Sequence, residues 1–127
     1  MGYQNVIIDA YTKNATIVKQ LQELIENDFI ELFKVVLVHG SVGTDEIIKY
    51  SDFDGLLIVK DNFVASKQLH DFKNKSMKLI LKFDPLQHHG WFQIKESDLS
   101  NYPESYLPIS TLERSKLIYP REDKIEL

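Results

Sequence analysis

The chain contains no cysteine among its 127 residues. Disulfide bonds, thiolate metal sites and thiol nucleophiles are therefore excluded, and cysteine usage says nothing about the redox compartment. The sequence also lacks an apolar run near the roughly 20 residues that a membrane-spanning helix needs, and its start has no basic segment followed by an apolar run. We therefore expect a cytoplasmic protein that does not bind a membrane.

Charge of one sign is not in large excess. Charged residues make up 27% of the chain and the net charge is −4, which is ordinary and argues against an extended nucleic-acid-binding surface. No internal repeat, low-complexity run or linker interrupts the sequence. With 43% hydrophobic residues, a chain of this length can build one modest core. We expect a single domain over residues 1–127.

Hydrophobic spacing predicts a helix and then a buried strand in the first part of the chain. Apolar residues recur at helical spacing after Thr12 or Asn14, either of which can serve as N-cap, as far as about Asn27. The continuous apolar run over residues 34–38, rich in β-branched side chains, is typical of a strand that is buried on both faces.

The order of the remaining elements indicates the fold class. The first of these elements are a loop or short helix over 41–49, a strand over 52–59, and a helix of about ten residues that Asn62 caps and that ends at 73–75. An antiparallel hairpin of strands 77–83 and 88–95 follows, then a helix over 109–116 and a short strand or packed end over 117–119. Together they predict an α/β or α+β fold, a small mixed β-sheet flanked by helices.

Two carboxylates begin one of the predicted strands. Asp52 and Asp54 are two residues apart, so their side chains would project from the same face of that strand. Two neighbouring carboxylates repel each other unless a positive charge lies between them. Oxygen ligands of this kind suit Mg²⁺ or Mn²⁺ better than Zn²⁺.

The stretch that surrounds these carboxylates resembles a known signature. An apolar strand that ends in Gly40-Ser41, followed after residues 42–51 by Asp52-Phe53-Asp54, is similar to the motif of the nucleotidyltransferase superfamily that includes DNA polymerase beta. The resemblance covers roughly residues 15–119 and implies that superfamily's fold. It also implies transfer of a nucleoside monophosphate from a nucleoside triphosphate to a hydroxyl or phosphate acceptor, with Mg²⁺.

The resemblance implies a role for each residue of the motif. Asp52 and Asp54 would be the catalytic carboxylates and the metal ligands, because phosphoryl-type transfer depends on charge neutralisation and positioning. Gly40 would let the triphosphate approach the backbone, and the Ser41 hydroxyl and the N–H groups after it would bind the outer phosphates. Lys49 is the nearest cation and would contact phosphate. The resemblance specifies neither the acceptor nor the base of the nucleotide.

Two departures from the superfamily pattern leave an alternative open. Members usually carry a third acidic residue on a later strand, and the expected hairpin puts Gln93 there, although Asp84, His88 or His89 could substitute for it. Gln93 has no charge and cannot take a proton. The Arg that often follows Gly-Ser is also missing. The alternative is therefore a catalytically impaired member that binds nucleotide or a small helical protein partner, as antitoxin-like domains of this type do.

Several other features have ordinary structural readings. An Asp-x-Asp pair can be a solvated strand edge, which would leave an unrelated α/β binding domain. Trp91 and Phe92 could stack a base, but aromatic residues in strands usually pack in the core. A weak basic cluster near the predicted hairpin could bind an acceptor or be a solvated face, and its members are Lys73, Lys75, Lys78 and Lys82.

Overall fold

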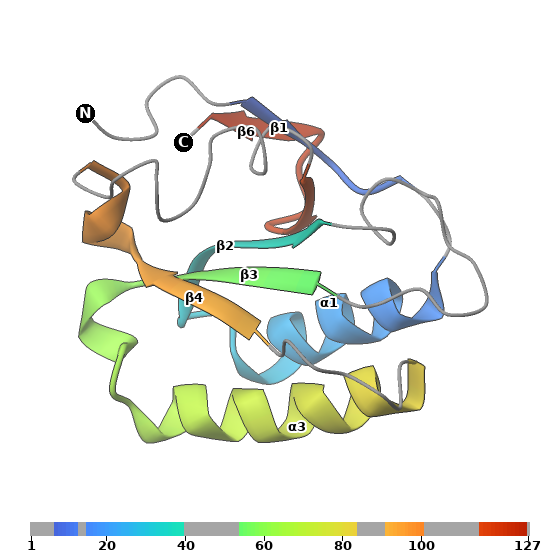
Figure 1. Ribbon diagram of the computed structural model, residues 1–127, viewed down its shortest axis with the longest axis horizontal. Coiled ribbons are helices and arrows are strands. Elements are labelled where there is room, and N and C mark those ends of the chain that lie inside the picture. Colours follow the sequence, from blue (N-terminus) through green and yellow to red (C-terminus); the bar gives the residue numbers. More distant parts are fainter. Residues whose placement is uncertain (1–6, 13–14, 40–53, 84–90, 101–114, 127) are drawn as a thin grey trace.

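A mixed four-stranded sheet lies at the centre of the computed structural model, which describes residues 7–12, 15–39, 54–83, 91–100 and 115–126. The order of its strands is β4-β3-β2-β5 (Figure 1). β2 is antiparallel to both β3 and β5, whereas β3 and β4 run parallel. The bounds of these strands are Phe33–His39 for β2, Asp54–Val59 for β3, Trp91–Lys95 for β4 and Lys116–Tyr119 for β5.

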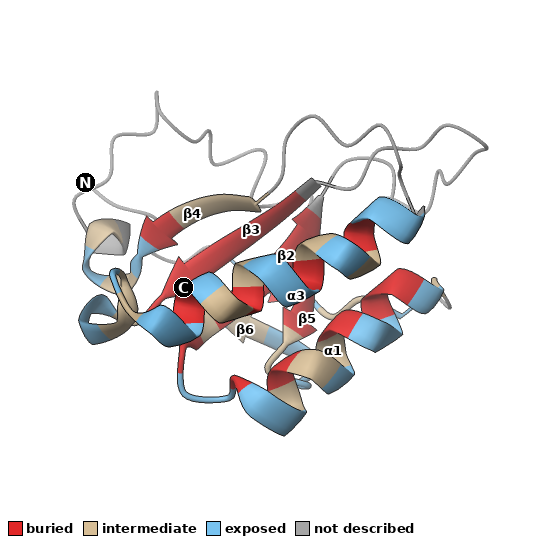
Figure 2. Cartoon of the chain, turned by 90° about the horizontal axis from the view of Figure 1, so that it is seen from below, coloured by how far each residue is buried: buried red, intermediate tan, exposed pale blue. Residues whose placement is uncertain are grey.

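Among the described elements, two helices and a short ribbon cover the two faces of this sheet. Helices α1 (Thr16–Asp28) and α3 (Lys67–Phe83) lie side by side on one face, as Figure 1 and the view from below in Figure 2 show. The antiparallel ribbon of β1 (Ile7–Asp9) and β6 (Lys124–Glu126) packs toward the other face. The predicted fold class, an α+β fold with a small mixed sheet and flanking helices, is confirmed.

The central strands divide the core into two layers. In β2, Val36 and Val38 pack with the helices, while Val35 and Leu37 pack on the side of the β1–β6 ribbon. All four are 0–2% exposed. Side chains alternate between the faces of a strand, so a strand that is buried on both faces must be apolar at every position. This explains why the run over residues 34–38 has no polar residue after Lys34.

The first predicted helix is confirmed as α1, but its predicted cap is wrong. Ile17, Val18, Leu21 and Ile25 form its buried stripe, as the helical spacing indicates. The N-cap is Ala15, which has an extended backbone and makes no side-chain capping bond. Thr12 therefore lies too early to cap the helix, and Asn14 lies outside the described residues.

The predicted strand over residues 77–83 is wrong, because these residues continue helix α3. Leu69, Phe72, Ser76 and Ile80 are buried at intervals of three and four residues, which is the spacing of one helix face. Alternation of lysine with apolar residues after Met77 fits a strand locally, but lysine, methionine and leucine are also good helix formers. Packing of the longer face against the sheet and α1 therefore decides the conformation.

The helix also begins later than predicted. Residues Asp61–Phe63 form a short 3₁₀ turn, η1, and α3 starts at Lys67. Ser66, rather than Asn62, provides the cap, since the backbone N–H of Leu69 donates to Ser66 Oγ at 3.1 Å. The Ser66 hydroxyl in turn donates to the carbonyl of Phe63 at 2.8 Å, which joins the 3₁₀ turn to the helix.

Because α3 crosses from the end of β3 to the start of β4, these two strands are parallel. The predicted antiparallel hairpin of 77–83 with 88–95 is therefore wrong, although a strand does occupy Trp91–Lys95. A second 3₁₀ turn, η2 (Glu96–Ser100), follows it. The predicted strand over 117–119 is confirmed as β5, and Lys116 belongs to it rather than to a helix. Residues 109–114 of that predicted helix lie outside the described part of the chain.

None of the helices in the described part of the chain combines the length and the apolar character needed to span a bilayer. The cytoplasmic location stays a prediction.

Candidate functional site

The described residues that border the sequence-predicted site lie at one end of the two central strands. His39, the last residue of β2, is the Cα partner of Asp54, the first residue of β3. Gly40 follows His39 directly along the chain, and Asp52 precedes Asp54 by two residues. The two halves of the predicted motif therefore adjoin one backbone pair of an antiparallel ladder.

Most of the predicted site residues lie outside the described residues. Gly40, Ser41, Lys49 and Asp52 belong to residues 40–53, and of the predicted site only the backbone of Asp54 is described. His88 and His89 likewise lie outside, in residues 84–90. Their predicted roles as phosphate contacts and metal ligands therefore stay predictions. Within the described ranges, no group of three or more His, Asp or Glu residues could hold a metal ion.

Alternation along β3 assigns position 54 to one side of the sheet. Gly55, Leu57 and Val59 form one alternate set, and Leu57 and Val59 pack with the helices. Leu56 and Ile58 form the other set and pack on the side of the β1–β6 ribbon. Position 54 belongs to this second set, which faces away from α1 and α3.

Gln93 does not occupy the predicted third position beside the Asp-x-Asp pair. In the parallel ladder Gln93 is the partner of Leu57, whereas Trp91 is the partner of Gly55. Gln93 therefore lies three positions along the ladder from residue 54 and belongs to the set that faces the helices. The prediction assumed an antiparallel hairpin strand, and the parallel direction of β4 changes its register.

The side chain of Gln93 lies in packed surroundings. It is half-buried, and its Oε1 atom is buried without a hydrogen-bond partner among the described residues. A carboxylate at this place would lose much of its hydration, and the structure gives it no described donor in return. The chemistry here is that of a packed strand residue rather than that of a metal ligand.

Trp91 connects the start of β4 to helix α3. Its indole N–H donates to Ser76 Oγ at 2.8 Å, and its ring lies 5.7 Å from the ring of Phe72, centroid to centroid. Phe72 is fully buried and also meets Phe33 edge to face, with 4.7 Å between ring centroids. Trp91 therefore packs against α3, as expected for an aromatic residue in a strand, because both its indole N–H and its ring contact that helix.

Lys116 is a cation at this end of the sheet that the sequence interpretation missed. It is the Cα partner of Val38, one row from the pair of His39 and Asp54. Alternation puts Lys116 in the same set as Ile118, which packs with the helices, so it belongs to the other side of the sheet from position 54. No local signal could have found it, since only the pairing of β5 with β2 brings it here.

In the part of the chain that the structure describes, the ionisable groups whose pKa values are shifted lie at the opposite end of the sheet. Among the described residues, Asp61 follows β3, and the backbone N–H of Ser97 donates to its Oδ1 at 3.0 Å. This bond lowers the pKa of Asp61 below its ordinary value. Tyr119 ends β5, and partial burial, followed by the nearby Glu26 carboxylate, raises the pKa of its phenol. The Tyr119 hydroxyl donates to the carbonyl of Ile30 at 3.0 Å, so each of the two groups bonds to a residue of another segment.

A shallow pocket of about 300 Å³ also lies at that opposite end. It lies beside the C-terminus of α1, where Phe29, Leu32 and Phe63 contribute apolar surface. Asp28 and Glu31 give it an acidic rim, so it is not suited to a triphosphate.

Comparisons with known proteins add a single likeness of fold. The sequence matches no protein-family model and no curated protein. The structure is similar to the crystal structure of a candidate nucleotidyltransferase from Sulfolobus solfataricus, with 14% sequence identity and a TM-score of 0.34. The match covers 84% of this chain and 90% of that chain. At this identity and score the likeness assigns no function.

Proposed function

We propose that the chain is a Mg²⁺-dependent nucleotidyltransferase-like domain that transfers a nucleoside monophosphate from a nucleoside triphosphate to an acceptor. The observation that carries the proposal is the pairing of His39 with Asp54, because it makes Gly40-Ser41 and Asp52-Phe53-Asp54 direct continuations of adjacent backbone positions. A phosphate-binding turn and a pair of carboxylates at one end of a sheet are the parts that this chemistry needs.

The chain's own residues would bind and orient the substrate. Gly40 would permit close approach of the triphosphate, and the Ser41 hydroxyl with the following backbone N–H groups would donate to its outer phosphates. Lys49 would add a phosphate contact. In the transfer, the acceptor oxygen forms a bond to the α-phosphorus, and the bond from that phosphorus to the departing diphosphate breaks. The proton of a hydroxyl acceptor passes to solvent.

The carboxylates of Asp52 and Asp54 fit the metal that this reaction uses. Hard oxygen donors are the ligands that Mg²⁺, and also Mn²⁺, prefer in proteins. When bound, the metal would neutralise charge on the triphosphate. We assign the base to no described residue, because the described β4 neighbours of β3 include no acidic side chain.

The lack of an acidic residue in β4 favours a second candidate function. The described part of this strand reads Trp-Phe-Gln-Ile-Lys, so it cannot contribute a third carboxylate. A domain with two carboxylates could still bind a nucleotide, or a small helical protein partner, without transferring a nucleoside monophosphate. Such a module would act by binding, as an antitoxin-like domain does, rather than by catalysis.

The experiment compares the natural chain with Asp54→Asn. Transfer from α-labelled nucleoside triphosphates to candidate acceptors is measured with Mg²⁺, and triphosphate binding is measured by calorimetry. We expect transfer to fall by at least about 100-fold in the variant if Asp54 ligates the catalytic metal. Asp9→Asn is a matched control, because Asp9 is exposed in β1 and should leave transfer unchanged.

The outcomes separate the two candidates. Transfer by the natural chain that D54N loses supports the enzyme. Mg²⁺-dependent triphosphate binding without transfer, weakened in D54N, supports the binding module. Equal behaviour of the natural chain and D54N in both assays contradicts the assignment of Asp54.

A further inference from the structure

The exposed side of α3 concentrates positive charge in a chain that is acidic overall. The helix contains five lysines and one acidic residue, whereas the whole chain has a net charge of −4. Because residues 77–83 continue the helix, Lys78 and Lys82 come into line with Lys67. At 3.6 residues per turn, these three lysines fall within about 60° around the helix axis. As a separate strand, residues 77–83 would not have aligned them.

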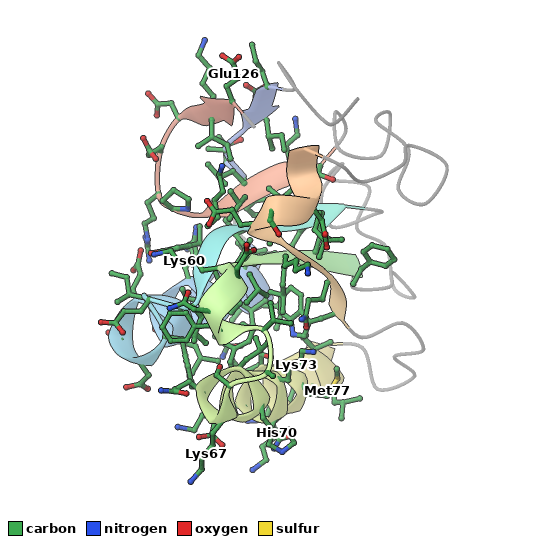
Figure 3. The ribbon with its side chains drawn as sticks, turned by 90° about the vertical axis from the view of Figure 1, so that its left-hand side faces the viewer. Lys60, Lys67, His70, Lys73, Met77 and Glu126 are labelled. Carbon is green, nitrogen blue, oxygen red and sulfur yellow. The ribbon has the colours of Figure 1, made fainter. Side chains whose placement is uncertain are left out.

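These lysines are directed to solvent. Lys67, Lys75, Lys78 and Lys82 are exposed, while the opposite stripe of the helix is buried against the sheet. Figure 3 shows Lys67 extending from α3 away from the sheet. The net charge argues against an extended nucleic-acid surface, but net charge does not show that the lysines of α3 are grouped on one side of the helix.

The charges on this side of α3 are weakly compensated. The ion pairs recorded among the described residues join Lys34 to Glu96 and Arg121 to Glu26, and neither involves α3. Lys75 lies over the ring of Phe29, 5.6 Å from its centroid. Asp71 is the acidic residue on this side of the helix, and it is half-buried. Within the described ranges, no acidic residue forms an ion pair with Lys67, Lys78 or Lys82, so these three lysines can contact an anionic partner.

The composition of this surface favours one kind of partner. Protein interfaces depend on buried aromatic or aliphatic anchors and are depleted in lysine, and Leu81 is the exposed large hydrophobic residue that the described part of α3 offers. A helix that binds a membrane surface inserts its apolar face, but that face of α3 packs in the core. Cations repeated along a helix without an apolar anchor suit the phosphates of a nucleic acid.

We propose that the exposed side of α3 binds the phosphodiester backbone of a nucleic acid strand through Lys67, Lys78 and Lys82. From the first to the last of these lysines the helix rises about 22 Å, so one strand could contact all three. RNA and DNA share this backbone chemistry. The surface requires neither Mg²⁺ nor a triphosphate, so it is independent of the proposed transfer reaction.

The test measures binding of fluorescein-labelled single-stranded RNA and DNA of about 16 nucleotides, a length at the upper end of common single-strand sites. Fluorescence anisotropy is recorded at 50 to 200 mM salt without Mg²⁺ or triphosphate. Three phosphate contacts predict a slope of log K against log salt near −2, which is about a 20-fold loss of affinity over that range. Tighter binding of RNA or of DNA shows which nucleic acid the surface prefers.

The decisive variant is K67Q/K78Q/K82Q. We expect it to lose at least about tenfold in affinity at 50 mM salt and most of the salt dependence, because it removes the proposed phosphate contacts. The matched control K19Q/K95Q/K124Q changes the net charge equally, but its exposed lysines lie in α1, β4 and β6. It should keep affinity within about threefold. The variant K67R/K78R/K82R keeps the charge and should keep binding.

Several results would overturn the proposal. They are no binding at 50 mM salt, equal losses in the two glutamine variants, and loss of binding in the arginine variant. Competition by poly-L-glutamate as strong as competition by unlabelled RNA, or equal binding to vesicles of anionic lipid, would also contradict it, since those results would indicate an acidic protein or a membrane. Circular dichroism confirms that each variant is folded.

Discussion

Replacement of Gln93 by Glu tests whether Gln93 lies opposite Leu57, as in the structure, or beside Asp54, as the sequence motif suggests. If Gln93 stood beside Asp54 in the third ligand position, Gln93→Glu would complete a metal site and increase Mg²⁺ affinity. The structure instead pairs Gln93 with Leu57, in the set of residues that faces the helices. There the new carboxylate would be half-buried among packed side chains, so we expect it to destabilise the fold.

The size of the effect follows from the burial. Oε1 of Gln93 is already buried without a partner in the described part of the chain, so a negative charge there loses hydration without compensation. We expect Q93E to lower the free energy of unfolding by about 1–3 kcal/mol at pH 7. Burial should raise the pKa of the new carboxyl, and each unit of that rise corresponds to about 1.4 kcal/mol.

The sign of the pH dependence is fixed by that rise. Below the pKa of the unfolded chain the carboxyl is neutral in both states and the penalty is absent. Above the pKa of the folded state the penalty is complete. The difference between Q93E and the natural chain should therefore shrink as the pH falls from 7 to about 4.

Urea denaturation followed by circular dichroism measures this effect between pH 4 and 7, with and without Mg²⁺. Gln20→Glu is the matched control, because Gln20 is exposed on α1 and its replacement should change stability by no more than about 0.5 kcal/mol. Mg²⁺ that stabilises Q93E more than the natural chain would refute the register argument, as would a penalty that does not change with pH.

Two further predictions concern contacts that fix β4 and the far end of the sheet. Ser76→Ala removes the acceptor of the Trp91 indole N–H at a fully buried position. It should cost about 1–2 kcal/mol in urea denaturation and shift the emission of the single tryptophan. Thr16→Ala, at an exposed residue that begins α1, should do neither. Asp61→Asn removes a carboxylate whose pKa is held down by the backbone N–H of Ser97, so it should lower the denaturation midpoint at pH 7. The difference between the variant and the natural chain should shrink as the pH falls through that lowered pKa. A difference that does not shrink at acidic pH would contradict this cause.

The sequence was sufficient to predict those elements whose local hydrophobic pattern matches their burial in the structure. The run that forms most of β2 is apolar over residues 35–38, and the stripe of α1 repeats at helical spacing, so both elements were predicted within a few residues of their bounds.

The errors arose where distant contacts decide the structure. Residues 77–83 satisfy strand alternation and helix propensity equally, and packing of Ile80 with the core selects the helix. The direction of β4 then follows from α3 as a crossover, which no pattern within Trp91–Lys95 could reveal. Strands β1 and β6 are three residues each and pair across nearly the whole chain, so they carry almost no local signal.

The same register limits where a third carboxylate could come from. Position 54 belongs to the set of Leu56 and Ile58, and the β4 partners of those two residues are Phe92 and Ile94, which are apolar. The described part of β4 therefore offers no carboxylate on that side of the sheet. An active enzyme would need one from residues outside the described strands, whereas a binding module would not. Transfer by the natural chain would therefore indicate that such a group exists, whereas triphosphate binding without transfer is what a site with two carboxylates predicts.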